Sequence, residues 1–222
     1  MPGGRLLGYA QTHDQVGNRA TGDRLTAAQL GAAATLVLTS PFTPMLFMGE
    51  EWGATTPWQF FTDHDDAELA SAITRGRRRE FAAHGWAEDE VPDPQDPATR
   101  NRSVLDWAEP DKPDHRELLE WYRSLIALRR AEPAIAEGRL DEVTATAGGR
   151  TLRVARGPFR ILVNFSDAPA RVPLNAPCEV LLARPACTVV AGPAVQLPPR
   201  GAAVLRVRDA GGDAGGDAGT LR

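Results

Sequence analysis

The sequence is poor in cysteine and contains no long apolar run. Its 222 residues include only two cysteines, Cys178 and Cys187. Two are too few for a disulfide framework or a structural zinc site, and they favour a reducing, cytoplasmic compartment. No apolar run reaches the roughly 18 residues needed to cross a bilayer, and the N-terminus lacks the apolar stretch of a signal peptide. We therefore expect a cytoplasmic protein that does not bind to or cross a membrane.

The sequence also lacks a net positive charge. The formal net charge is -4, and Lys112 is the only lysine. Because general nucleic-acid binding depends on neutralising phosphates with clustered cations, this balance argues against nucleic acid as a partner. The densest basic run, at residues 75–79, falls on a predicted helix with Glu80 and Ser71 nearby, and we expect it to form a solvated face. The alternative is that one of its arginines contacts a sugar or a partner.

What the first part of the chain does contain is an alternation of strand and helix patterns. The predicted elements are buried strands at 5–11 and 44–48 and helices at 25–39, 66–81 and 114–132, the last with Asp114 as N-cap. Each predicted strand ends in polar residues. This order is typical of a parallel α/β fold. The connection over 49–112 is long for a compact domain and rich in aromatic residues, which favours a functional role for it.

The second part of the chain changes in texture. From residue 137 short β-type runs alternate with Gly, Pro and Asn turns at spacings of about eight to ten residues. This pattern predicts a small antiparallel β-sandwich, and the Gly- and Asp-rich end predicts a disordered tail. The predicted domains are an α/β part at 1–134, a sandwich at 135–208 and the tail at 209–222.

Several strings of residues resemble known enzymes. YAQTHDQVGNRATGDRL, at residues 9–25, resembles the segment of α-amylase-type glycoside hydrolases in which His-Asp closes the seventh strand of a (β/α)8 barrel, and GEEWG resembles the segment after the eighth strand. The strings PFTPMLFMGEEWGATTPWQFFTDH, GRRREF, DPQDPATRNRS and LDW resemble more narrowly the maltooligosyltrehalose trehalohydrolase family. The similarity covers residues 9–132, and the sandwich resembles the C-terminal domain of the same enzymes. The implied fold class is α/β plus all-β: the last two βα units of a TIM barrel, followed by a small β-sandwich.

This resemblance implies a retaining glycosidase that cleaves maltooligosyltrehalose, an α-1,4-glucan, to release trehalose without any cofactor. In the family, the nucleophilic aspartate follows the fourth strand and the acid/base glutamate follows the fifth, whereas this chain begins at the seventh. We therefore expect the chain to be inactive alone and to need a separate N-terminal barrel half. A truncated gene product, a misannotated start and one half of a split enzyme remain open. The alternatives are a non-catalytic α-glucan-binding or remnant protein and part of a general α-amylase-type hydrolase.

His13 and Asp14 are the strongest candidates for chemistry. Catalytic groups of such barrels lie at the C-terminal ends of strands, where these two residues fall. Carried over from the family, Asp14 is the catalytic stabiliser of the transition state and His13 binds the same sugar. The alternative is that the pair simply caps the strand end. A metal centre needs further ligands, and with only four histidines in the chain we expect none.

Six other residues are candidates for substrate binding, each with a structural alternative. Aromatic faces suit glucose rings but also pack in cores, and the acidic residues after the second strand could instead fix the loop through backbone amides. Arg19 could orient Asp14. Asp63 and His64 could bind a sugar or could instead cap a helix. The candidates are Arg19, Glu51, Trp52, Trp58, Asp63 and His64.

Overall fold

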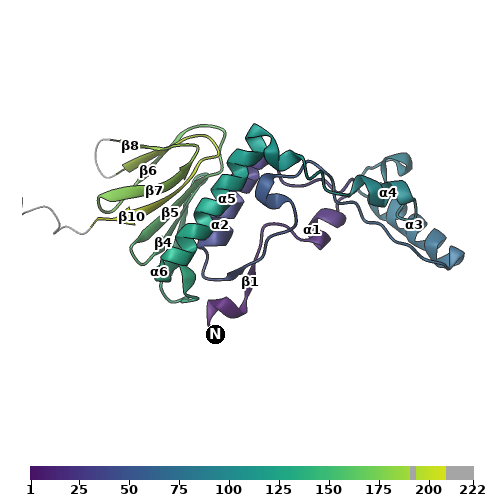
Figure 1. The fold of residues 1–222 in the computed structure, drawn as a ribbon, viewed down its shortest axis with the longest axis horizontal. Coiled ribbons are helices and arrows are strands. Elements are labelled where there is room, and N and C mark those ends of the chain that lie inside the picture. The colour runs from purple at the N-terminus through teal and green to yellow at the C-terminus, as the bar shows by residue number, and fades with distance from the viewer. Residues whose placement is uncertain (191–193, 209–222) are drawn as a thin grey trace, which may run out of the picture. The chain divides into compact units, whose positions relative to one another are not determined.

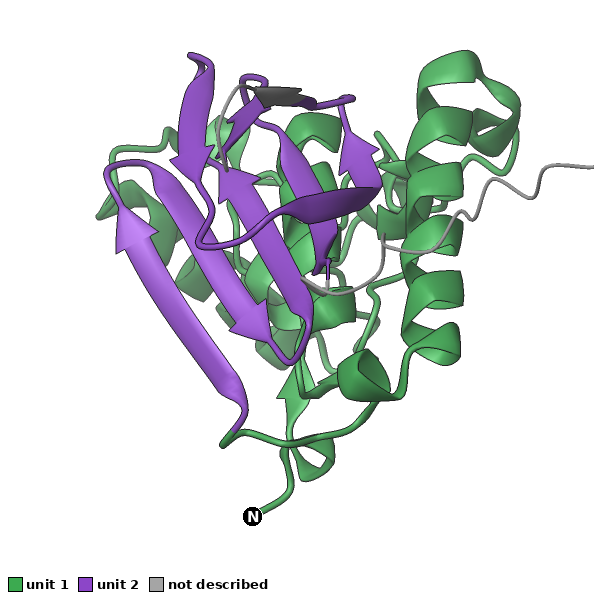
Figure 2. Ribbon diagram, turned by 90° about the vertical axis from the view of Figure 1, so that its left-hand side faces the viewer, with its two compact units in different colours: residues 1–141 green, residues 142–222 purple. Residues whose placement is uncertain are grey.

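The computed structural model describes residues 1–190 and 194–208, so the expected disordered tail at 209–222 lies outside the described residues. The chain divides into two compact units, Met1–Asp141 and Glu142–Arg222 (Figure 2). This division lies a few residues beyond the boundary expected after residue 134. The short helix α6 (Pro133–Ala136) still packs on the helix before it, and the backbone N–H of Gly3 donates to the Gly138 carbonyl at 2.6 Å.

The first unit begins with two parallel strands, β1 (Leu7–Gly8) and β2 (Thr43–Pro44). Both are shorter than the strands expected at 5–11 and 44–48, and the first is not buried, since Leu7 is 59% exposed. The residues before it form a 3-10 turn, η1 (Gly3–Arg5). A parallel strand is held by neighbours on both sides, but within the described residues these two strands pair only with each other.

Two long helices follow the strands and lie side by side, α2 (Ala27–Thr39) and α5 (Pro113–Ala131) (Figure 1). Helix α2 starts at a capping box formed by Thr26 and Gln29. The indole Nε1 of Trp121 on α5 donates to the carbonyl of Gly31 on α2 at 3.1 Å. The N-cap of α5 is Lys112 and not the expected Asp114, because Pro113 takes the first helical position, where proline needs no hydrogen-bonding N–H.

The remaining elements of the first unit, apart from α6, occupy the two strand exits and the long connection. They are α1 (His13–Gly17), η2 (Glu50–Trp52), α3 (Ala67–Ala82), η3 (Glu88–Glu90), α4 (Pro97–Arg102) and η4 (Glu109–Asp111). Helix α3 matches the helix predicted at 66–81. The prediction that its arginines form a solvated face is wrong for Arg77. This residue is buried, its guanidinium lies 4.8 Å from the centre of the Phe60 ring, and its Nη2 donates to the Gly17 carbonyl at 2.5 Å. The aromatic ring and the carbonyl satisfy a guanidinium that water would otherwise hydrate.

The second unit is an antiparallel β-sandwich, in agreement with the predicted fold class. One sheet has the order β3-β4-β5-β10-β7 and the other β6-β9-β8. The strands are β3 (Val143–Gly148), β4 (Thr151–Arg156), β5 (Phe159–Asn164), β6 (Ala170–Pro173), β7 (Cys178–Arg184), β8 (Thr188–Val190), β9 (Ala194–Leu197) and β10 (Ala202–Val207). Leu162 and Leu205 of the first sheet share one buried cluster with Val195 and Leu197 of the second, so the two inner faces form a single core.

No helix within the described residues is both long enough and apolar enough to cross a membrane.

Candidate functional site

The exit of β1 presents His13 and Asp14 on the first turn of α1. The Oγ1 of Thr12 accepts hydrogen bonds from the backbone N–H groups of Asp14 at 3.2 Å and Gln15 at 3.5 Å, so Thr12 is the N-cap. The His13 Nε2 lies 3.2 Å from the Asp14 Oδ1, and the two side chains are 71% and 73% exposed. Thr12, and neither His13 nor Asp14, therefore caps α1, and both of these side chains are largely exposed.

A buried carboxyl lies behind this exit. Glu50 is 1% exposed, and its oxygens accept from the Gln11 Nε2 at 3.4 Å and from the Tyr122 hydroxyl at 3.4 Å. The Gln11 Oε1 in turn accepts from the backbone N–H of Leu25 at 2.8 Å. The Glu50 carboxyl thus contacts side chains from two distant segments, and a backbone hydrogen bond at Phe47 also acts on it, as expected of a loop-fixing glutamate. Burial raises the pKa of Glu50 to about 7, although the hydrogen bonds oppose it.

Arg24 holds the loop that follows β2. Its Nε donates to the Thr56 carbonyl at 2.7 Å, its Nη1 donates to the Met48 carbonyl at 2.8 Å, and the guanidinium lies 4.9 Å from the Phe47 ring. Burial lowers the pKa of Arg24, and the nearby carboxylates partly offset that effect. The candidate Glu51 lies in the same loop, and its Oε2 is buried without a hydrogen-bond partner in the described part of the chain.

Trp52 lies in the interior. Stacking on a sugar would require it to lie at the surface. It is 4% exposed, its Nε1 donates to the Glu109 Oε2 at 3.3 Å, and its ring lies 5.3 Å from that of Trp107. The expectation that an indole is rarely fully buried failed here because Glu109 satisfies the indole N–H. Burial opposes ionisation of Glu109, but hydrogen bonds from Thr55 and Trp52 lower its pKa overall. Trp107, 73% exposed, is a surface indole that was not among the candidates, although the LDW string contains it.

Trp58 is half-buried and adjoins α1. Its ring makes edge contacts with Phe47 at 5.7 Å and Phe61 at 5.5 Å. Its backbone N–H donates to the Gly22 carbonyl at 2.8 Å. Gly22 has φ +70°, and a Cβ there would lie 2.3 Å from the Trp58 carbonyl oxygen, so only glycine allows this approach. The close approach fixes Trp58 against the loop that leaves the His-Asp turn.

The remaining candidates are Arg19, Asp63 and His64. Among the described residues, none of the three forms a hydrogen bond or ion pair with His13 or Asp14. The Arg19 Nε donates to the Asp23 Oδ2 at 2.7 Å, and this pairing takes the place of the expected contact with Asp14. The hydrogen bond between Arg19 and Asp23 also lowers the pKa of Asp23. Asp63 and His64 are exposed, and neither caps α3, because Asp66 does.

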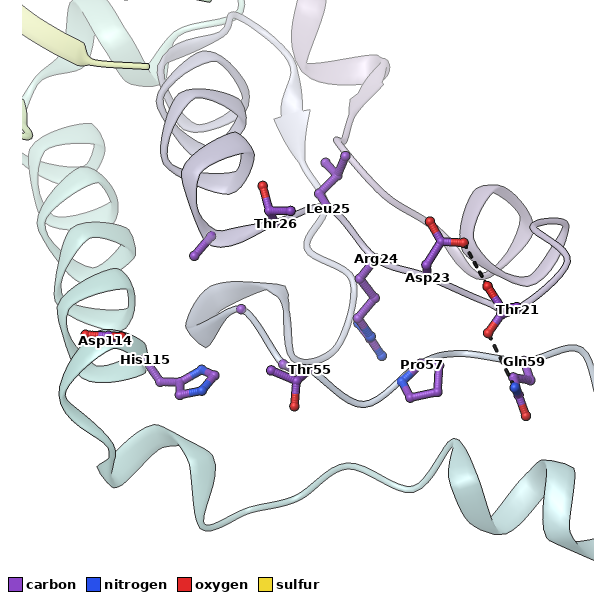
Figure 3. Close-up of a pocket in the computed structure, with 13 residues that line it drawn as sticks. Thr21, Asp23, Arg24, Leu25, Thr26, Thr55, Pro57, Gln59, Asp114 and His115 are labelled. Atoms are coloured by element: carbon purple, nitrogen blue, oxygen red, sulfur yellow. Dashed lines mark hydrogen bonds between the residues drawn. The ribbon is translucent and has the colours of Figure 1, made fainter. Parts of the chain in front are cut away.

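A pocket of about 740 Å³ opens beside the starts of α2 and α5 (Figure 3). Its lining includes Arg24, Thr55 and Gln59 but none of the candidate catalytic or substrate-binding residues named from the sequence. His115 also lines it, and its Nδ1 lies 2.7 Å from the Trp52 carbonyl oxygen. Since a carbonyl only accepts, Nδ1 carries the hydrogen. In the part of the chain that the structure describes, no three His, Cys, Asp or Glu side chains are grouped to hold a metal ion.

Comparison with curated proteins finds close relatives of one kind. The chain is 53% identical over 208 residues to a malto-oligosyltrehalose trehalohydrolase of Rhizobium sp. (strain M-11), covering 90% of this chain and 35% of that protein. A protein of the same name from Deinococcus radiodurans is 38% identical, with 83% and 34% covered. No protein-family model matches the chain. The chain thus spans about a third of the length of the curated relatives it matches.

Solved structures agree with this relationship. A crystal structure of a protein provisionally named an alpha amylase, from Salmonella typhimurium, superposes with a TM-score of 0.77 and 32% identity, covering 93% of this chain and 36% of that one. A trehalulose synthase superposes with a TM-score of 0.59 at 21% identity, which supports the fold alone. The α-amylase-type fold class expected from the sequence is therefore confirmed.

Proposed function

Because the chain belongs to the malto-oligosyltrehalose trehalohydrolases over the third of their length that it spans, we propose that it supplies the last two βα units and the C-terminal sandwich of such an enzyme. The complete enzyme would hydrolyse the α-1,4 bond between a maltooligosyl chain and its terminal trehalose, and release trehalose with retention. Its substrate is an α-1,4-glucan, and two carboxyl groups and water suffice for the reaction without a cofactor.

The observation that carries the proposal is the exposed His13–Asp14 pair at the exit of β1. A carboxylate held 3.2 Å from an imidazole nitrogen presents acceptors and a donor side by side, a pattern that suits vicinal hydroxyls of one sugar ring. When the glycosidic bond breaks, positive charge develops on the sugar. Asp14 would stabilise that charge through hydrogen bonds that strengthen in the transition state, with His13 binding the same ring.

Bond cleavage itself needs two further carboxyl groups. In a retaining mechanism one carboxylate attacks the anomeric carbon, while a carboxylic acid protonates the leaving oxygen of trehalose. Water then hydrolyses the glycosyl-enzyme ester, and the second group removes its proton. Glu50 is unsuited to either task, because its carboxyl is 1% exposed and engaged by Gln11 and Tyr122. We propose that both groups come from the part of the barrel that precedes this segment in the relatives.

Other residues around the strand exits would shape the substrate site. Trp58, half-buried beside α1, offers a ring edge near the His-Asp turn, and Glu51 offers a carboxylate after β2. Arg19 would act through Asp23, and the surface residues Asp63 and His64 would contact more distant glucose units. Trp52 would contribute indirectly, as the buried support of the exposed Trp107.

A second candidate function is a general α-amylase-type activity on maltodextrins, which the similarity to the Salmonella typhimurium protein favours. One assay separates the two. Purified protein is incubated with maltooligosyltrehalose or with maltodextrin of the same length, and trehalose and reducing sugar are measured. Trehalose release well in excess of maltodextrin cleavage supports the narrower activity, and comparable cleavage of both contradicts it.

The same assay applies to the 222-residue chain alone and to the chain mixed with a separately expressed polypeptide that carries the first six βα units. We expect no trehalose release from the chain alone and release from the mixture. Release by the chain alone would contradict the assignment of the nucleophile and the acid to another part of the barrel. Release from neither sample, with binding of maltooligosaccharide retained, would favour a non-catalytic glucan-binding protein.

A further inference from the structure

A second pocket, of about 500 Å³, lies between the segment that follows Trp58 and the start of α4. Its size is within the usual range for sites that bind small molecules. Its lining includes Phe61, Thr62, Asp63, Gln95, Asp96 and Arg100. Among the candidates for substrate binding named from the sequence, only Asp63 lines this pocket, and residues 94–101 belong to the DPQDPATRNRS string.

The walls of this pocket are fixed by hydrogen bonds across two segments of the chain. The Gln95 Nε2 donates to the Thr62 Oγ1 at 2.5 Å, and the Gln95 Oε1 accepts from the backbone N–H of His64 at 3.2 Å. The backbone N–H of Thr62 donates to the Pro94 carbonyl at 2.9 Å. Asp96 caps α4 by accepting from the Ala98 N–H at 2.8 Å. The pocket is therefore preorganised, and a ligand need not order its walls.

Two charged groups in the pocket remain available. Asp63 makes no side-chain hydrogen bond or ion pair with any residue the structure describes, and Arg100 uses only its Nη1, which donates to the Asn101 Oδ1 at 3.1 Å. The two opposite charges line one pocket without pairing with each other. A carboxylate that only accepts and a guanidinium that only donates suit a ligand with several hydroxyl groups, since each hydroxyl can both donate and accept.

An apolar surface completes the pocket. Phe61 lines it. The centre of its ring lies 5.5 Å from that of Trp58, and the centre of the Trp58 ring lies 5.7 Å from that of Phe47. This row of rings connects the loop after β2, beside the His-Asp turn, with the pocket. Aromatic rings pack well against the apolar faces of glucose. A bare anion is disfavoured by Asp63 and Asp96, and a metal ion by Arg100.

We infer that this pocket is a remote glucosyl subsite, in which Asp63 and Arg100 bind the hydroxyls of one glucose unit of an α-1,4-glucan against the Phe61 ring. The inference rests on the proposed function for the identity of the ligand. It assigns Arg100 and the segment at 94–101 to substrate binding. It also predicts that longer glucan chains bind more tightly than chains too short to reach the pocket.

Binding is tested first, without catalysis. The complete protein is titrated calorimetrically with maltohexaose and with maltotriose. Asp63→Asn and Arg100→Gln should each weaken maltohexaose binding by about 3- to 10-fold, because each removes a charged hydrogen-bonding group. The matched controls Asp89→Asn and Arg79→Gln, exposed residues outside the pocket, should leave it unchanged. Unaltered maltohexaose affinity in both pocket variants would overturn the inference.

Kinetics then separate this inference from the proposed function. In both pocket variants kcat/KM should fall more for a long maltooligosyltrehalose than for a short one. An equal fall for both lengths, or no fall, would overturn the subsite while leaving the hydrolase activity intact. Conversely, an inactive protein whose maltohexaose binding depends on Asp63 and Arg100 would refute the proposed activity and support the subsite.

Discussion

The hydroxyl of Tyr122 donates to the carboxyl of Glu50 at 3.4 Å across 72 residues of sequence. The same carboxyl accepts from Gln11, two residues before His13. A single buried group thus joins α5, the loop after β2 and the segment that leads into the His-Asp turn. Both strand exits depend on it for their position.

The first prediction concerns Glu50 and pH. Its folded-state pKa is raised to about 7, so the folded protein binds a proton between about pH 4.5 and 7 that the unfolded chain has lost. The stability that this proton contributes is fully present below pH 4.5 and is lost as the pH rises through 7. The free energy of unfolding of the wild type should therefore fall by up to about 3 kcal/mol between pH 5 and 8, and this fall should be absent in Glu50→Gln.

Urea unfolding at both pH values, followed by tryptophan fluorescence, measures this effect. All five tryptophans of the chain lie in the first unit, so the signal reports that unit. Glu117→Gln, an exposed glutamate on α5, is the control and should retain the wild-type pH dependence. A Glu50→Gln variant with an unchanged pH dependence would contradict the assignment.

The second prediction concerns Asp14. Asp14→Asn keeps the shape of the side chain but removes the charge that should stabilise the developing cation. In the complete enzyme kcat should fall by at least about 100-fold, with a smaller effect for His13→Ala. Because Asp14 is exposed and Thr12 caps α1, the thermal midpoint should hardly change. Near-normal kcat in Asp14→Asn would refute the catalytic role.

The third prediction contrasts two arginines of one loop. Arg24 donates to two separate carbonyls and lies over Phe47, so Arg24→Lys should lower the free energy of unfolding by about 1–3 kcal/mol. Arg19 forms an exposed ion pair with Asp23, so Arg19→Lys should cost less than about 1 kcal/mol. Chemical denaturation of both variants gives the comparison, and equal losses would contradict the role of Arg24.

The fourth prediction concerns the second unit, whose two sheets share one core. Limited trypsin digestion should cut after the exposed Arg139, just before the division between the units. Mass spectrometry should then recover a protected species of about residues 140–208. The first unit, with only two short strands, should be digested earlier than the second. A species covering residues 1–132 that outlasts the sandwich would contradict this prediction.

Local patterns predicted several elements well because their signals are themselves local. The helices predicted at 25–39, 66–81 and 114–132 correspond to α2, α3 and α5, because helical periodicity depends on residues three or four apart. The eight strands of the sandwich follow from alternation and turn residues in the same way. Strand length in the first unit was overestimated, since it depends on neighbouring strands and not on the residues of the strand itself.

The candidate site divides along the same line. The sequence by itself determined that His13 and Asp14 follow a strand, that aromatic residues crowd the connection after β2, and that the chain resembles one family of hydrolases, because strings of adjacent residues carry all of this. Only the tertiary structure decided that Trp52 is buried on Glu109, that Arg19 pairs with Asp23, and that Asp63 shares a pocket with Arg100. Burial and pairing are set by groups distant in sequence, whose approach no local pattern encodes.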